Sequence, residues 1–195
     1  MRLLLEHPLA WVVSHGGGSW RATPLPLRPE GGDGERPIEA LIGHFARSNP
    51  QLELVRQDPE ALVLFLGVNG AISPSWFGDR TQAPTWNYTS VQYRVELQLF
   101  DEPAPRDAAL ADLVGAVEAG RENAWSSADM GARYQPLARR IVAFRARILE
   151  RHVKFKLGQD ERDDIYADIL AALDREGAGE LSSWMRAANP QRPRR

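Results

Sequence analysis

Apolar and polar residues alternate with a period of two in several segments of this chain, and that pattern predicts β-strands. The clearest example is TSVQYRVELQLF (89–100), a half-buried strand by its alternation. Its apolar positions are Val91, Tyr93, Val95, Leu97 and Leu99. LAWVVS (9–14) and RATPLPL (21–27) flank the glycine-rich HGGGSW, so together they predict a β-hairpin.

Two more segments predict strands, and two predict loops. ALVLFLGVNG (61–70) predicts a buried strand that ends in an Asn-Gly turn, and ARRIVAFRARILERHVKFKL (138–157) predicts a pair of strands. RPEGGDGERP (28–37) is a loop by composition. AISPSWFGDRTQAPTWNY (71–88) is also expected to be a loop, with an unusual number of aromatic residues.

Helical periodicity appears in four places. The expected helices are 48–57, with Asn49 as N-cap and Pro50 at the first helical position, the amphipathic segment 105–123, the segment 160–177 with its acidic first turn, and a last short helix at 179–189. IEALIGHFA (38–46) fits both a helical and a period-two pattern, and periodicity alone leaves the two alternatives open. The element count favours an antiparallel barrel or sandwich surrounded by helices.

Composition excludes several classes of protein. The 195 residues have a formal net charge of −2, so no global attraction to nucleic acid or anionic membrane is expected. Cysteine is absent, which excludes disulfides and thiolate metal sites, and the four histidines show no metal-ligand spacing. The apolar N-terminal stretch is interrupted by Glu6, His7 and Pro8 and is too short to span a bilayer. We therefore expect a cytoplasmic protein without membrane association or a metal site.

Two stretches could carry chemistry. GHFARSNPQ (43–51) places Arg47 and Ser48 beside a proline-fixed helix start, which can be an ordinary cap or an anion site. The 71–88 segment crowds four aromatic residues among hydroxyl and amide groups, which suits either an aromatic cluster under a loop or a planar hydrogen-bonding ring. A phosphate site and a ring platform together would describe a flavin mononucleotide (FMN) site.

GHFARSNPQ and the later AISPSWFGDRTQAPTWNYTSVQ closely resemble motifs of the PaiB-type family of FMN-binding negative transcriptional regulators. IVAFRARI (141–148) and KLGQD (156–160) resemble the closing motifs of that family. The resemblance implies a mainly β (α+β) fold with peripheral helices, an FMN-binding split β-barrel like that of pyridoxamine-phosphate oxidase. It implies a homodimer with FMN near the interface, and it implies that 38–46 is a strand.

The resemblance also implies which residues bind the cofactor. The phosphate would lie at Arg47, Ser48 and Asn49, the 73–88 motif would line the ring and the ribityl chain, and Lys156 and Gln159 match the late polar motif. The cofactor-binding residues expected on this basis are His44, Arg47, Ser48, Asn49, Ser73, Ser75, Trp76, Thr85, Trp86, Asn87, Tyr88, Lys156 and Gln159. No catalytic residue is expected.

The chain departs from the family pattern at Pro24, Gly158 and Asp160, where family members tend to carry histidine, serine and asparagine. The expected domains are a split barrel over 1–157 and a helical appendage with a basic tail over 158–195. The alternatives on the same barrel are an FMN-dependent oxidoreductase and a protein that handles haem or another ligand. Any DNA binding is expected to be electrostatic and to use the Arg139–Arg140 region or the QRPRR tail (191–195).

Overall fold

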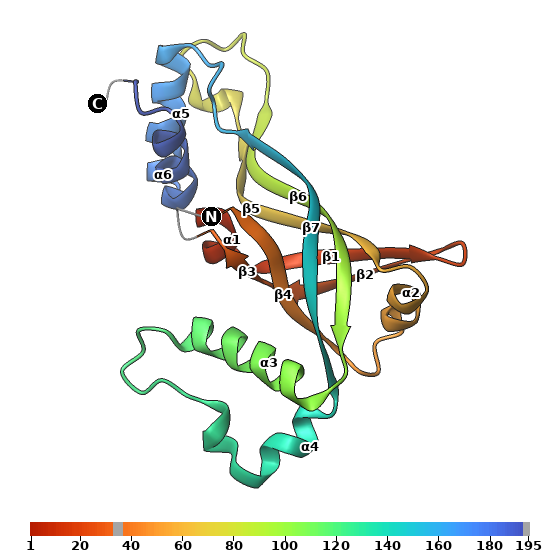
Figure 1. Cartoon of the computed structure of the whole chain (residues 1–195). Helices are drawn as coiled ribbons and strands as arrows, with labels where there is room; N and C mark the ends of the chain where they lie inside the picture. The colour runs from red at the N-terminus through yellow and green to blue at the C-terminus, as the bar shows by residue number, and fades with distance from the viewer. Residues whose placement is uncertain (33–36, 193–195) are drawn as a thin grey trace. The chain divides into compact units, whose positions relative to one another are not determined.

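The computed structural model describes residues 1–32 and 37–192. Within these ranges seven strands form one sheet, in the order β2-β1-β5-β6-β7-β4-β3 (Figure 1). The strands are β1 (Leu9–Gly16), β2 (Ser19–Pro26), β3 (Arg28–Gly31), β4 (Ile38–Ala46), β5 (Glu60–Ile72), β6 (Thr85–Phe100) and β7 (Ile141–Lys156). The helices are α1 (Arg2–Glu6), α2 (Gln51–Gln57), α3 (Pro103–Glu118), α4 (Tyr134–Ala138), α5 (Asp163–Arg175) and α6 (Gly179–Ala188), with 3-10 segments η1 (Pro74–Trp76) and η2 (Ser127–Arg133).

The chain divides into two compact units. Unit 1 comprises Met1–Phe65 and Gln92–His152, and unit 2 comprises Leu66–Val91 and Val153–Arg195. This division does not follow the expected boundary at residue 157, because β5, β6 and β7 each run from one unit into the other.

Unit 1 contains the predicted hairpin, in which every residue of β1 pairs with a residue of β2 in antiparallel register. It also contains 38–46, which is strand β4, as the family resemblance implied. The strand pattern prevails there because Leu41 and Phe45 are fully buried, and the Phe45 ring packs 5.0 Å from that of Phe144 on β7. Gly43 between them is buried as well, so the buried positions recur at every second residue, which fits a strand, whereas a helix would turn Gly43 away from Leu41 and Phe45.

Unit 2 contains α5 and α6, both near their predicted positions. Ile165, Ile169 and Leu173 of α5 are spaced at four-residue intervals and are almost fully buried, so they form the apolar face of the helix. The segment between η1 and β6 is anchored by the buried Phe77. It is also joined to α5 by the hydrogen bond from the Gly78 N–H to the Asp168 carboxylate, at 3.1 Å.

Four expectations about strands were wrong. The segment 138–157 contains one long strand, β7, and not a pair. β5 continues through the Asn69-Gly70 dipeptide, β6 begins inside the expected 71–88 loop, and β3 lies within the expected 28–37 loop. Each added stretch is held by hydrogen bonds to a neighbouring strand, which outweigh the local preference for a turn.

The sequence also did not indicate α1, α4 or η2. No helix within the described ranges combines the length and the apolar character needed to cross a membrane.

Candidate functional site

The turn between β4 and α2 carries the predicted anion site, and Arg47 is its best-fixed side chain. The Arg47 guanidinium donates from Nε to the Arg139 carbonyl at 2.8 Å and from Nη2 to the Ile141 carbonyl at 3.2 Å. Its Nη1 forms an ion pair with Asp101 at 2.7 Å. These bonds use three of the five N–H groups of an arginine, and 43% of the side chain is exposed. Arg47 therefore fixes the start of β7 and can still donate to a ligand.

The helix start differs from its prediction by one residue. α2 begins at Gln51, and Pro50 occupies the capping position with helical backbone angles. The Asn49 side-chain oxygen still accepts a hydrogen bond from the Gln51 N–H at 2.9 Å, as a capping group would. Its amide donates to the Thr23 hydroxyl at 2.9 Å. The Asn49 side chain is thus used to hold β2 against the turn.

Gln51, which the sequence analysis did not single out, is fully buried at the centre of a polar network. Its Nε2 donates to the Val12 carbonyl at 3.0 Å and to Ser14 Oγ at 2.9 Å. Its Oε1 accepts from the Thr23 hydroxyl at 2.6 Å. The only sequence signal was a glutamine beside the apolar residues of a short helix. The network joins the β1–β2 hairpin to the candidate anion site.

His44 lies on β4 and is half-buried. Its Nδ1 atom is buried, and among the described residues no group hydrogen bonds to it. Burial lowers the pKa of the imidazole, so the neutral ring is favoured in the folded protein. A neutral histidine with a free ring nitrogen can donate to or accept from a ligand.

In unit 2 the structure brings together two segments that the sequence analysis had assigned to one site. The Lys156 ammonium group at the end of β7 contacts the Thr85 hydroxyl at the start of β6. The Ser73 and Ser75 hydroxyls lie 2.7 Å apart, and Ser73 also caps η1 by accepting from the Ser75 N–H.

The TWNY stretch (85–88) lies on β6, so its side chains alternate between the two faces of a strand. Trp86 is 53% exposed, and its indole N–H donates to Asn69 Oδ1 at 3.2 Å. Asn87 is buried, and its Oδ1 has no hydrogen-bond partner among the described residues. A flat ligand on one face would contact either Trp86 and Tyr88 or Thr85 and Asn87 through their side chains, but not all four.

The two remaining predicted residues also have local roles. Gln159 accepts from the Leu157 N–H at 2.7 Å and donates to the Phe155 carbonyl at 2.9 Å, so its side chain stabilises the turn after β7. Trp76 is half-buried in η1.

The predicted residues therefore form two groups, one in each unit. Unit 1 holds His44, Arg47, Ser48 and Asn49, and unit 2 holds the other nine. A cavity of about 740 Å³ lies in unit 1 and another of about 720 Å³ in unit 2. None of the predicted residues lines either of these two cavities.

Comparison with known proteins decides the family. Residues 1–150 match the family model described as "Putative FMN-binding domain". The chain belongs to this PaiB-type FMN-binding family. It is 27% identical over 173 residues to the "Protease synthase and sporulation protein PAI 2" of Bacillus subtilis, an alignment that covers 88% of this chain and 81% of the relative. FMN is accordingly the cofactor of this family member.

Solved structures agree on the fold. The flavocytochrome Anf3 of Azotobacter vinelandii matches with a TM-score of 0.62 and 18% identity, over 85% of this chain and 70% of that one. The FAD and heme binding protein of Mycobacterium smegmatis matches with a TM-score of 0.59 and 20% identity, over 85% and 74% of the two chains. The fold is the flavin-binding split barrel, as the sequence resemblance implied.

The residues present fit FMN by the chemistry of their donors. Arg47 with the exposed Ser48 hydroxyl supplies the cation and the donor that a phosphate requires. In unit 1, the buried Nδ1 of His44 has no hydrogen-bond partner among the described residues, so a bound molecule could satisfy it. When bound, FMN supplies a ring that can accept and release electrons, and the protein's own groups hold and orient it.

Proposed function

We propose that this protein is a PaiB-like, FMN-binding regulator of transcription that acts as a homodimer, and that Arg47 and Ser48 bind the FMN phosphate. The observation that carries the cofactor part is the fixed, exposed guanidinium of Arg47. An arginine held by two carbonyls loses little further side-chain entropy when it binds a phosphate.

The negative charge of Asp101 opposes this role only in part. Asp101 lies 2.7 Å from Arg47 and 3.6 Å from Arg56, so two arginines share one carboxylate. The Arg47–Ser48 turn keeps a net positive character, which favours a phosphate.

The test compares FMN with riboflavin, which lacks the phosphate. Titration by flavin-fluorescence quenching should show FMN binding the wild-type protein at least about tenfold more tightly, since a charge-assisted hydrogen bond contributes roughly 1.5–3 kcal/mol. Ser48→Asp should abolish this preference, because it places a carboxylate beside the phosphate. Ser48 is exposed, so the substitution should leave the fold intact.

The matched control is Ser183→Asp, the same change at an exposed serine of α6. It should leave the affinity for FMN unchanged. Equal loss of FMN and riboflavin binding in Ser48→Asp would mean that residue 48 does not contact the phosphate. An unchanged FMN preference would remove the turn from the site.

The homodimer is proposed from an exposed apolar face of unit 1. Leu9 and Trp11 of β1 and Leu62 of β5 are 60%, 51% and 37% exposed, and Trp11 pairs directly with Leu64 of the neighbouring strand. Apolar side chains on adjacent strands form a continuous patch, and such patches usually mark interfaces. A second copy of the chain could cover the patch by a symmetric contact.

Sedimentation at micromolar concentration should give twice the chain mass of 21.8 kDa. Trp11→Lys should shift the protein towards monomer. Trp125→Lys, at a 42% exposed tryptophan between α3 and η2, should not. A wild-type monomer, or equal behaviour of the two variants, would contradict the proposed interface.

The proposed role in regulation rests on the resemblance to the PaiB-type family of regulators and on exposed arginines. Arg139 and Arg140 are exposed and follow α4. Arg192, expected to belong to a free tail, instead packs 4.5 Å above the Tyr166 ring, and its Nη2 donates to the Gln159 and Glu161 carbonyls. The expectation for residues 193–195 lies outside the described residues. This leaves Arg139 and Arg140 as the first candidates for phosphate contacts with DNA.

An anisotropy titration would compare the duplex upstream of the protein's own gene with a scrambled duplex. An Arg139→Gln/Arg140→Gln variant should weaken binding to both duplexes. The slope of log affinity against log salt concentration should decrease by the equivalent of about two phosphate contacts per protomer. No binding by the FMN-loaded dimer would contradict the regulatory proposal and leave the cofactor proposal standing.

A further inference from the structure

A row of three side chains crosses the outer face of the β3–β4–β7 part of the sheet. Arg28 of β3 pairs with Ile42 of β4, and Ile42 pairs in turn with Arg145 of β7. Directly opposed residues on antiparallel strands point to the same face. Two arginines therefore flank one isoleucine.

Each arginine is neutralised by a carboxylate from another part of unit 1. The Arg145 guanidinium binds both oxygens of Glu30, at 2.7 and 2.8 Å, and Arg28 pairs with Asp112 of α3. Arg145 lowers the pKa of Glu30, so the Glu30 carboxylate is ionised at neutral pH. Among the described residues that line the cavity of unit 1, the charged side chains are these two cations and two anions.

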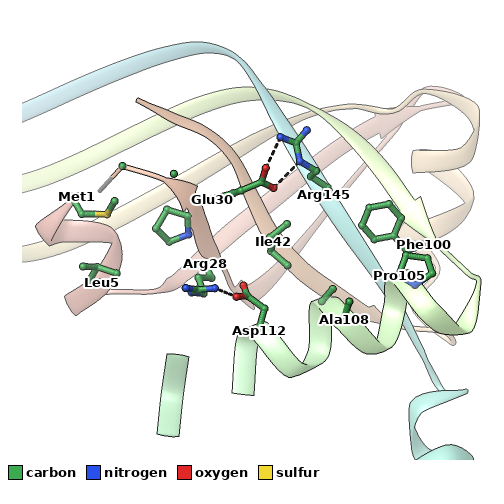
Figure 2. Close-up of a pocket in the computed structure, with 14 residues that line it drawn as sticks. Met1, Leu5, Arg28, Glu30, Ile42, Phe100, Pro105, Ala108, Asp112 and Arg145 are labelled. Atoms are coloured by element: carbon green, nitrogen blue, oxygen red, sulfur yellow. Dashed lines mark hydrogen bonds and ion pairs between the residues drawn. The ribbon is translucent and has the colours of Figure 1, made fainter. Parts of the chain in front are cut away.

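These four residues line the cavity of about 740 Å³ in unit 1 (Figure 2). In Figure 2 the two ion pairs lie on either side of Ile42, and Phe100 with Pro105 closes a third side. The volume lies in the range of small-molecule sites, and such sites combine apolar walls with a few fixed polar groups.

The charged residues of this cavity favour ligands of a particular charge. Arg28 and Glu30 are two residues apart on β3, so they project from the same face about 6–7 Å apart. They offer a cation and an anion side by side, next to an apolar wall. A ligand with one net charge would be attracted by one member of each ion pair and repelled by the other, whereas a ligand that carries both charges can pair with a cation and an anion at once.

We propose that this cavity binds a zwitterionic small molecule with an apolar body, the chemistry of a free apolar α-amino acid. The ligand carboxylate lies against an arginine, its ammonium group against Glu30, and its apolar part against Ile42 and Phe100. This site is separate from the proposed phosphate turn, since neither Arg47 nor Ser48 lines the cavity.

The test uses the FMN-saturated protein and three probes that share the leucine side chain, in isothermal titration calorimetry. The probes are L-leucine, which is a zwitterion, L-leucinamide, which is a cation, and N-acetyl-L-leucine, which is an anion. Leucine should bind with a Kd of roughly 1 mM or below, and each singly charged probe should bind roughly tenfold more weakly. Equal binding of leucine and N-acetyl-leucine, or no leucine binding, would overturn the proposal.

A charge variant makes the test sharper. Glu30→Gln keeps the shape of the side chain and adds one net positive charge to the cavity. This variant should bind leucine roughly tenfold more weakly than the wild type and should bind N-acetyl-leucine more tightly. Loss of binding for both probes would indicate a folding defect at the cavity and would overturn the charge argument.

The matched control is Glu96→Gln. Glu96 forms an ion pair with Arg147, also on β7, but neither residue lines the cavity. This variant should bind all three probes as the wild type does. A Glu96→Gln effect as large as that of Glu30→Gln would show that the response is not specific to the cavity.

Discussion

Replacing Gln51 by leucine removes the centre of the polar network that joins α2 to the hairpin. Leucine has a similar volume but cannot make the three hydrogen bonds to Val12, Ser14 and Thr23. Thr23 keeps a partner, because Asn49 also donates to its hydroxyl. The Val12 carbonyl and the Ser14 hydroxyl each lose the hydrogen bond from the Gln51 amide. Both residues are at most 1% exposed.

The magnitude follows from the buried Ser14 hydroxyl. A buried polar group left without a partner costs about 1–3 kcal/mol, so Gln51→Leu should lower the free energy of unfolding by about that amount. The matched control is Gln57→Leu, an exposed glutamine of the same helix, which should change it by less than about 0.5 kcal/mol.

Urea unfolding followed by far-UV circular dichroism measures both variants. Ser14→Ala, combined with Gln51→Leu, should recover part of the lost free energy of unfolding, because it removes the hydroxyl that has lost its partner. If Gln51→Leu were no more destabilising than Gln57→Leu, the network would not hold the turn in place, and the argument from buried hydrogen bonds would be refuted.

Two further predictions concern β4. Gly43→Ala should destabilise the fold by about 1–3 kcal/mol in urea unfolding, because the new Cβ would lie 2.4 Å from Leu27 Cδ2. Its control is Gly115→Ala in α3, where the new Cβ meets open space and the change should be neutral or stabilising. Burial lowers the pKa of His44, so the unfolded chain binds its proton more readily and stability should fall as pH drops below about 6.5. His44→Gln should reduce this loss of stability at low pH, and His15→Gln, at an exposed histidine, should not. Equal stability-versus-pH profiles of the two variants would contradict the assignment of the effect to His44.

The sequence by itself determined the elements in which one local pattern dominates. The hairpin around HGGG, the alternating strand at 89–100 and the helix near 160–177 all appear where their local sequence placed them. In each case the side chains that must be buried lie on one face, so the local pattern and the tertiary packing require the same backbone.

The residues of the candidate site come from sequence motifs, whereas their contacts come from the structure. The motif GHFARSNPQ was identified from its sequence, yet Arg47 interacts with residues more than 50 positions away, such as Asp101 and Ile141. Such partners depend on which strands become neighbours, and no local pattern encodes that. The same reason explains why Gln51 was overlooked, because its hydrogen bonds cross 28 to 39 positions.

Only the tertiary structure decided where strands end and which side chains share a face. Asn69-Gly70 has the composition of a turn, but β5 continues through it, and 141–156 is one strand although its alternation is loose. The β6 pleat separates Trp86 from Asn87, which the sequence had placed in one ring-binding group. Hydrogen bonds between strands favour a continuous ladder over a local turn, and the pleat then assigns each side chain to a face, so both outcomes depend on the neighbouring strand.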